Sequence, residues 1–219
     1  MRMTYEEALR ASQKQNWQRL SPLSRVEVLQ TIENHVAAEM YRTPREVKGK
    51  WLYVDGNGVL LGQYVDKDKK IEVNFDHLGP DSQFGETSDR MIETVLHEGR
   101  HSYQKQVVAG EIAHPNAEEA KAWAANLAPG GYVSFNQNPR AYYGQPVEVD
   151  ARSFAEGRLR ELQRERAALT QTKDARETFV RQVSQQTRAA HSREASPKDS
   201  NIQDIYQRDS AKHGHGMKR

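Results

Sequence analysis

Two histidines and a glutamate near the middle of the chain have the types and the spacing of a metal-dependent hydrolytic site. They stand in the run His97-Glu98-Gly99-Arg100-His101, an H-E-x-x-H arrangement. Residues four apart on a helix lie one turn apart on the same face, so the imidazoles of His97 and His101 can share one tetrahedral metal ion. Glu98 is placed to act as general base toward a water molecule on that metal, and then as proton donor to the leaving group.

A catalytic zinc site takes a third protein ligand and leaves a fourth position for water. Glu148 is the first candidate, because Pro146 begins a predicted helix and a glutamate in its first turn projects from a fixed end. Asp150 is an alternative, but it points roughly 200° away from Glu148 on the helix, so at most one of the two can bind. His77 and His114, both in predicted loops, are further alternatives.

The composition narrows the class of protein. The chain of 219 residues has no cysteine, which excludes disulfides, thiolate metal sites and cysteine nucleophiles and leaves nitrogen and oxygen as metal ligands. Its 32 basic and 30 acidic side chains nearly balance, so we expect no nucleic-acid partner. No apolar run approaches the ~20 residues of a membrane span, and no secretory signal is visible. We expect a cytoplasmic protein without membrane contact, with a non-classical route of secretion left open.

The elements that position these residues follow from periodicity and turn chemistry. Residues 4–41 predict helices that restart at Ser21-Pro22. Residues 51–54, 59–65 and 71–75 predict three strands of a small antiparallel sheet, with a hairpin turn at 55–58 and one solvent-facing side on the last strand.

The second half of the chain is predicted to be mainly helical. A helix over residues 89–109, capped by Thr87 or Ser88, carries the H-E-x-x-H run. An irregular, aromatic-rich stretch covers residues 128–146, and a charged helix follows from Val147 to about His191. The fold class is therefore α+β, with a flexible polar tail at 192–219.

The chain resembles the zincin metallopeptidases. The resemblance lies in His97 to His101 followed by Glu148-x-x-Ala151-x-x-Phe154-Ala155. It is strongest to the gluzincin-type branch, which includes ImmA/IrrE-like proteins and zincin-like domains of bacterial polymorphic toxins. It implies a zincin-like peptidase core at residues 50–160, after an N-terminal helical segment at 1–49 and before a charged helical extension at 161–191.

The resemblance also implies roles for individual residues. It implies Zn²⁺ held by His97, His101 and Glu148, with Glu98 as base, and a strand edge that receives the substrate peptide. By β-addition that edge would be residues 71–75. Position 152 is Arg where many gluzincins carry Asp, so the partner that orients a ligand imidazole is left unassigned.

A hydrogen-bond donor is also needed near the developing oxyanion. Tyr143, Tyr142 and His114 are the candidates, and Tyr143 is the one we select. The expected function is zinc-dependent hydrolysis of peptide bonds in a protein or peptide substrate. The alternatives are a non-catalytic, metal-stabilised interaction protein, favoured by Arg100 and the charged helix, and an effector or toxin module that uses the same site.

Overall fold

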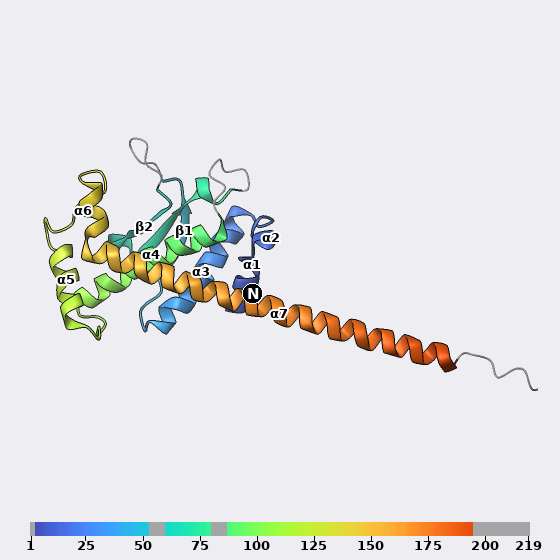
Figure 1. The fold of residues 1–219 in the computed structure, drawn as a ribbon. Coiled ribbons are helices and arrows are strands. Elements are labelled where there is room, and N and C mark those ends of the chain that lie inside the picture. Colours follow the sequence, from blue (N-terminus) through green and yellow to red (C-terminus); the bar gives the residue numbers. More distant parts are fainter. Residues whose placement is uncertain (1–2, 53–59, 80–86, 195–219) are drawn as a thin grey trace, which may run out of the picture. The chain divides into compact units, whose positions relative to one another are not determined.

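The computed structural model describes residues 3–52, 60–79 and 87–194. The predicted turn at 55–58 and the predicted tail beyond residue 194 lie outside these ranges. The described residues form seven α-helices and three strands (Figure 1), which confirms the α+β class. The elements are α1 (Tyr5–Ala11), α2 (Lys14–Trp17), α3 (Pro22–Glu39), β1 (Glu46–Lys50), β2 (Gly62–Val65), β3 (Lys70–Asn74), α4 (Ser88–Val108), α5 (Ala117–Leu127), α6 (Pro139–Gly144) and α7 (Pro146–Glu194).

The chain divides into two compact units, Met1–Leu169 and Thr170–Arg219. All predicted site residues belong to the first unit. The described part of the second unit is the remainder of α7. The predicted boundaries after residues 49 and 160 stay predictions. None of the described helices combines the length and the apolar character needed to span a membrane.

Side-chain caps set the starts of α3 and α4. Ser21 accepts a hydrogen bond from the Ser24 amide at the start of α3, where Pro22 takes the first helical position. Thr87 caps α4 in the same way, as predicted. The chain leaves α4 at Gly110, whose φ of +75° is a left-handed conformation that glycine adopts without strain.

The sheet differs from the predicted antiparallel one. Its order is β1-β3-β2, and β1 pairs with β3 in parallel while β2 pairs with β3 antiparallel. The first described strand is Glu46–Lys50, and of the predicted strand 51–54, residues 51 and 52 are not in a strand while 53 and 54 lie outside the described residues. Its sequence has one strongly apolar residue, Val47, and the strand is held by pairing with β3 and by the Val47 amide donating to Gln30 Oε1 at 2.6 Å. Long-range pairing overrides weak local propensity here.

Because β3 is the central strand, the prediction that residues 71–75 form a substrate-binding edge is wrong. Both sides of β3 are already paired, and among the described strands β2 is the edge strand next to α4. The predicted solvent-facing side of β3 is also wrong. Glu72 and Asn74 are buried: Glu72 contacts Lys50 and Lys70, and the Asn74 side-chain amide donates to the carbonyl oxygen of Leu52.

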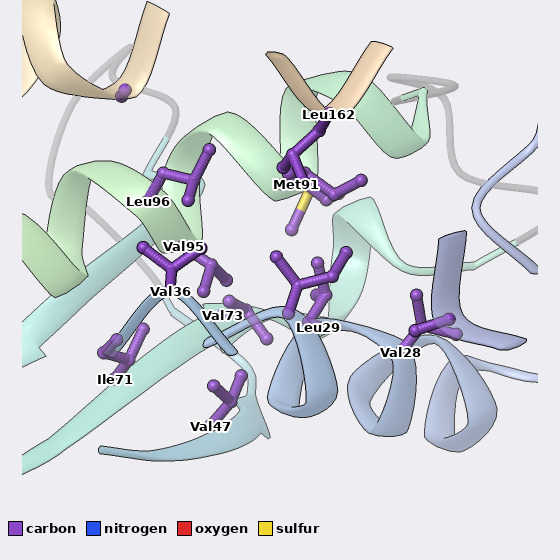
Figure 2. Close-up of a cluster of buried hydrophobic side chains, with 14 of the residues drawn as sticks. Val28, Leu29, Val36, Val47, Ile71, Val73, Met91, Val95, Leu96 and Leu162 are labelled. Atoms are coloured by element: carbon purple, nitrogen blue, oxygen red, sulfur yellow. The ribbon is translucent and has the colours of Figure 1, made fainter. Parts of the chain in front are cut away.

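The larger of two apolar clusters joins the helices to the sheet. Figure 2 shows Leu29 of α3, Val73 of β3, Met91 of α4 and Leu162 of α7 directed into the same cluster. Each of these four side chains is fully buried. Burying residues of this size contributes about 1.5–3 kcal/mol each, so the core fixes α4 against the sheet and the first half of α7 against α4.

A buried ion pair fixes the contact between α3 and α4. Arg42 donates to both carboxylate oxygens of Glu33 at 2.6 Å, and both side chains are 1% exposed. Gly99 of α4 lies directly against this pair: a Cβ there would stand 2.6 Å from Arg42 Nη2 and 2.9 Å from Glu33 Oε2. The glycine in the H-E-x-x-H run therefore lets the two helices approach.

Candidate metal centre

Helix α4 presents His97 and His101 side by side, as the spacing predicts. Their Nε2 atoms are 3.0 Å apart, and the rings meet edge to face with centroids 4.6 Å apart. Both side chains are mostly buried, with 18% and 17% of their surface exposed. The helix is anchored on its opposite side by Val95 and Leu96 in the core, so the imidazoles have a rigid support.

Glu148 completes the group. Pro146 begins α7, and the buried Val147 packs with Tyr103 and Trp123 in a second apolar cluster. The following residue, Glu148, is 1% exposed. Its Oε2 lies 3.4 Å from His97 Nε2 and its Oε1 lies 3.4 Å from His101 Nε2. One ligand atom from each of the three residues falls within 4.8 Å of the others, an arrangement that could hold a metal ion.

The three side chains perturb one another electrostatically. Burial opposes ionisation of Glu148, but the hydrogen bonds and charges of His101 and His97 outweigh it and hold the pKa of the carboxyl well below its usual range. Burial likewise opposes a charge on His101, yet Glu148 and Glu98 raise the pKa of its imidazole to about 9. A carboxylate buried between two imidazoles thus creates a strong local preference for positive charge.

Glu98 lies beside the group and touches the edge strand. Its Oε2 accepts a hydrogen bond of 2.7 Å from the backbone amide of Tyr64 in β2. Glu98, His101 and Glu148 line one cavity of about 510 Å³. The carboxylate is therefore fixed at the boundary between the sheet edge and the candidate metal site.

The tyrosines of this cavity are not the one selected from the sequence. Tyr132 and Tyr142 line it, and Tyr132 Oη donates to Glu148 Oε1 at 2.8 Å. Burial and the charge of Glu148 raise the pKa of both phenols. Tyr143 is 53% exposed, its ring lies against Arg152, and it is not among the cavity-lining residues. Helix α6, which the sequence did not predict, turns neighbouring aromatics in different directions.

The alternative ligands lie outside the group. Asp150 accepts two hydrogen bonds from Arg100, at 2.8 and 2.9 Å. His114 contacts the Tyr103 hydroxyl and Glu119. His77 is buried in the short 3₁₀ helix after β3. In the described ranges, the metal-binding group consists of His97, His101 and Glu148.

One further residue was not identified from the sequence. Gln104, fully buried on α4, lies 2.9 Å from His101 Nδ1 through its Oε1. Its amide nitrogen contacts Asp150 Oδ2 at 2.6 Å. The local signal is its position three residues after His101, on the same face of the helix.

Comparisons of the chain with protein-family models, with curated proteins and with solved structures give no match. The geometry of the site is therefore the basis for a functional proposal.

Proposed function

We propose that this chain is a zinc-dependent metallopeptidase that hydrolyses peptide bonds in a protein or peptide substrate. The observation that supports the metal best is the spacing of the three ligand side chains. Atoms bound at ~2.0–2.1 Å to a tetrahedral zinc ion are about 3.3 Å apart. His97 Nε2 and His101 Nε2 are 3.0 Å apart, and each lies 3.4 Å from one oxygen of the Glu148 carboxylate, Oε2 for His97 and Oε1 for His101.

The chemical nature of the donors fits zinc as well. Two imidazole nitrogens and one carboxylate form the ligand set of catalytic zinc sites that keep one position open. Zinc bound there would lower the pKa of a coordinated water toward ~7 and polarise the scissile carbonyl. The cavity of about 510 Å³ lined by Glu98, His101 and Glu148 leaves room for a substrate segment.

Glu98 would take a proton from the attacking water as the new C–O bond forms, and would pass it to the amine nitrogen as the C–N bond breaks. The Tyr64 amide holds this carboxylate in place. Tyr142, whose raised pKa keeps it protonated, would donate a hydrogen bond to the oxyanion, while Tyr132 donates its proton to Glu148. Tyr142 replaces Tyr143 as the candidate because it lines the cavity.

The substrate peptide would extend along β2. This strand is the edge of the sheet on the side of α4, and its Tyr64 amide reaches Glu98. An extended peptide added to this edge would bring one of its carbonyls close to the three ligands.

Metal analysis and a cleavage assay test the proposal together. Purified wild-type protein, saturated with zinc and desalted, should retain about one zinc per chain, and His97→Ala should retain almost none. Glu98→Gln should keep the zinc and lose cleavage of a peptide library. Full cleavage by Glu98→Gln would refute Glu98 as the base, and less than about 0.2 zinc per wild-type chain would refute the metal site.

The charge of Arg100 no longer favours the alternative of a non-catalytic interaction protein. Arg100 is engaged with Asp150 and stacks against Tyr103 and Phe154. Its charge therefore has a partner inside the protein. Zinc binding without cleavage of any peptide in the library would favour this alternative.

A further inference from the structure

We propose that Gln104, held in place by Asp150, is a positioning residue that fixes the tautomer of His101 and aims its Nε2 lone pair at the metal. The inference depends on the metal site of the proposed function, but it does not depend on peptide hydrolysis. Three contacts of Gln104, together with the burial of its side chain, carry it.

The orientation of the Gln104 amide follows from its neighbours. The nitrogen Nε2 lies 2.6 Å from Asp150 Oδ2 and 2.9 Å from the Val147 carbonyl oxygen. Both neighbours can only accept hydrogen bonds, because Asp150 is paired with Arg100 as a carboxylate. The NH₂ group must therefore face them, and the opposite assignment would set oxygen against oxygen at both positions.

The tautomer of His101 follows from the amide. With its NH₂ group facing Asp150, Gln104 presents Oε1 to His101 Nδ1 at 2.9 Å. An amide oxygen only accepts, so Nδ1 carries the proton in the neutral imidazole. Nε2 then has a free lone pair, and it is the atom that faces His97 Nε2 and Glu148. Only this tautomer can bind a metal between the three ligand side chains.

Arg100 makes this arrangement rigid. Its guanidinium donates to both oxygens of Asp150 and packs against three aromatic rings, with distances of 4.5 Å to Tyr103, 5.3 Å to Trp123 and 4.9 Å to Phe154. Bidentate pairs of this kind are geometrically strict. The chain of contacts from Arg100 through Asp150 and Gln104 to His101 thus couples α4 to α7, the two helices that supply the metal ligands. It also provides the imidazole partner that Arg152 does not supply.

The tautomer can be measured on the wild-type chain. Zinc-loaded protein with ¹⁵N-labelled histidine should show His101 bound through Nε2, with an Nδ1 proton protected from solvent exchange, in long-range ¹H–¹⁵N spectra. Zinc bound through Nδ1 of His101, or an Nδ1 proton that exchanges freely, would overturn the inference. This measurement needs no variant and no activity.

A pair of substitutions tests the consequence for metal affinity. Gln104→Met keeps the volume of the side chain but removes the acceptor, and partners of this kind typically contribute about 10–100-fold to metal affinity. The matched control is Gln106→Met on the same helix. Gln106 is also buried, and it contacts Ser102 and the Thr43 amide rather than a metal ligand.

Competition with a chromophoric chelator at fixed pH gives the zinc dissociation constants, and circular dichroism verifies folding. We expect a rise of about 10–100-fold for Gln104→Met and under about 3-fold for Gln106→Met. Equal rises, or no rise in Gln104→Met, would refute the positioning role. Normal zinc binding with the expected tautomer but no peptide cleavage would remove the peptidase function and leave this inference intact. Failure of the wild type to bind zinc would remove the metal site on which both depend.

Discussion

Gly99→Ala should destabilise the protein, although alanine is the better helix former. The added methyl group would stand 2.6 Å from Arg42 Nη2 and 2.9 Å from Glu33 Oε2, well inside normal contact distance. Neither side chain can swing into solvent without cost, because the two form a buried bidentate pair. One of the groups, or helix α4 itself, must therefore move.

The magnitude is a difference between two effects. Forcing an extra methyl group into a packed interior costs about 1–3 kcal/mol. Replacing glycine by alanine within a helix gains about 0.8–1.0 kcal/mol. The net loss in free energy of unfolding is about 0–2 kcal/mol with a central value near 1 kcal/mol. For a chain of this size the central value lowers the melting temperature by roughly 2–4 °C, and the upper value lowers it by up to about 8 °C.

Gly157→Ala is the matched control. Gly157 also lies inside a helix, but apart from that helix's own backbone, no atom of the described residues stands within 4 Å of the position of its Cβ. The same substitution should raise the melting temperature there by roughly 2–4 °C. Thermal melts by circular dichroism compare the two variants with the wild type. A rise in melting temperature for Gly99→Ala as large as that for Gly157→Ala would refute the close contact between Gly99 and the buried ion pair.

Three further predictions address the site and the sheet. Tyr142→Phe removes the proposed hydrogen-bond donor to the oxyanion and should lower kcat by ~100-fold in a peptide-cleavage assay, whereas Tyr143→Phe should change it less than about 2-fold; equal effects would contradict the assignment. Free zinc at 100 times its Kd should stabilise the wild type by about 2.7 kcal/mol, and a similar rise in melting temperature for His97→Ala would show that the metal binds elsewhere. Burial opposes ionisation of Glu72, but the hydrogen bonds from Gln63 and Lys70 outweigh it and lower the pKa of this carboxyl in the folded protein. Its contribution to stability is therefore present above its ordinary pKa of about 4.3 and is lost as the pH falls toward the lower pKa of the folded protein. Glu72→Gln should destabilise the protein more at pH 7 than at pH 4 in urea titrations, and an equal loss at both would refute the pairing.

The helices of residues 4–41, α4 and α7 were predicted well because their signals are local, whereas α5 and α6 were not predicted. Thr87 caps α4 as expected, and Pro146 begins α7. The sheet was predicted less well. The sequence favoured the apolar run at 51–54, but the pairing partner of β3 is Glu46–Lys50, which is largely charged. A strand that is stabilised mainly by pairing with its neighbours can have a sequence with weak strand propensity.

Around the metal ligands, too, contacts between separate elements were predicted less well than features with a local sequence signal. The aromatic stretch suggested a tyrosine at the site, but α6 directs Tyr142 into the cavity and leaves Tyr143 exposed. Asp150 was an alternative metal ligand, but in the structure its carboxylate accepts hydrogen bonds from Arg100 and Gln104. The outcome for Asp150 depends on contacts between α4 and α7, two segments far apart along the chain, which no spacing rule encodes.

The sequence by itself determined the positions of His97, Glu98 and His101 relative to one another, because the helical repeat is set by backbone hydrogen bonds between near neighbours. It also indicated Glu148 at a fixed helix start. Only the tertiary structure decided that Glu148 meets both histidines, that β2 rather than β3 is the edge beside Glu98, and that Gln104 orients His101. The reason is physical: these contacts join separate elements, and their geometry is set by how those elements pack around the shared core.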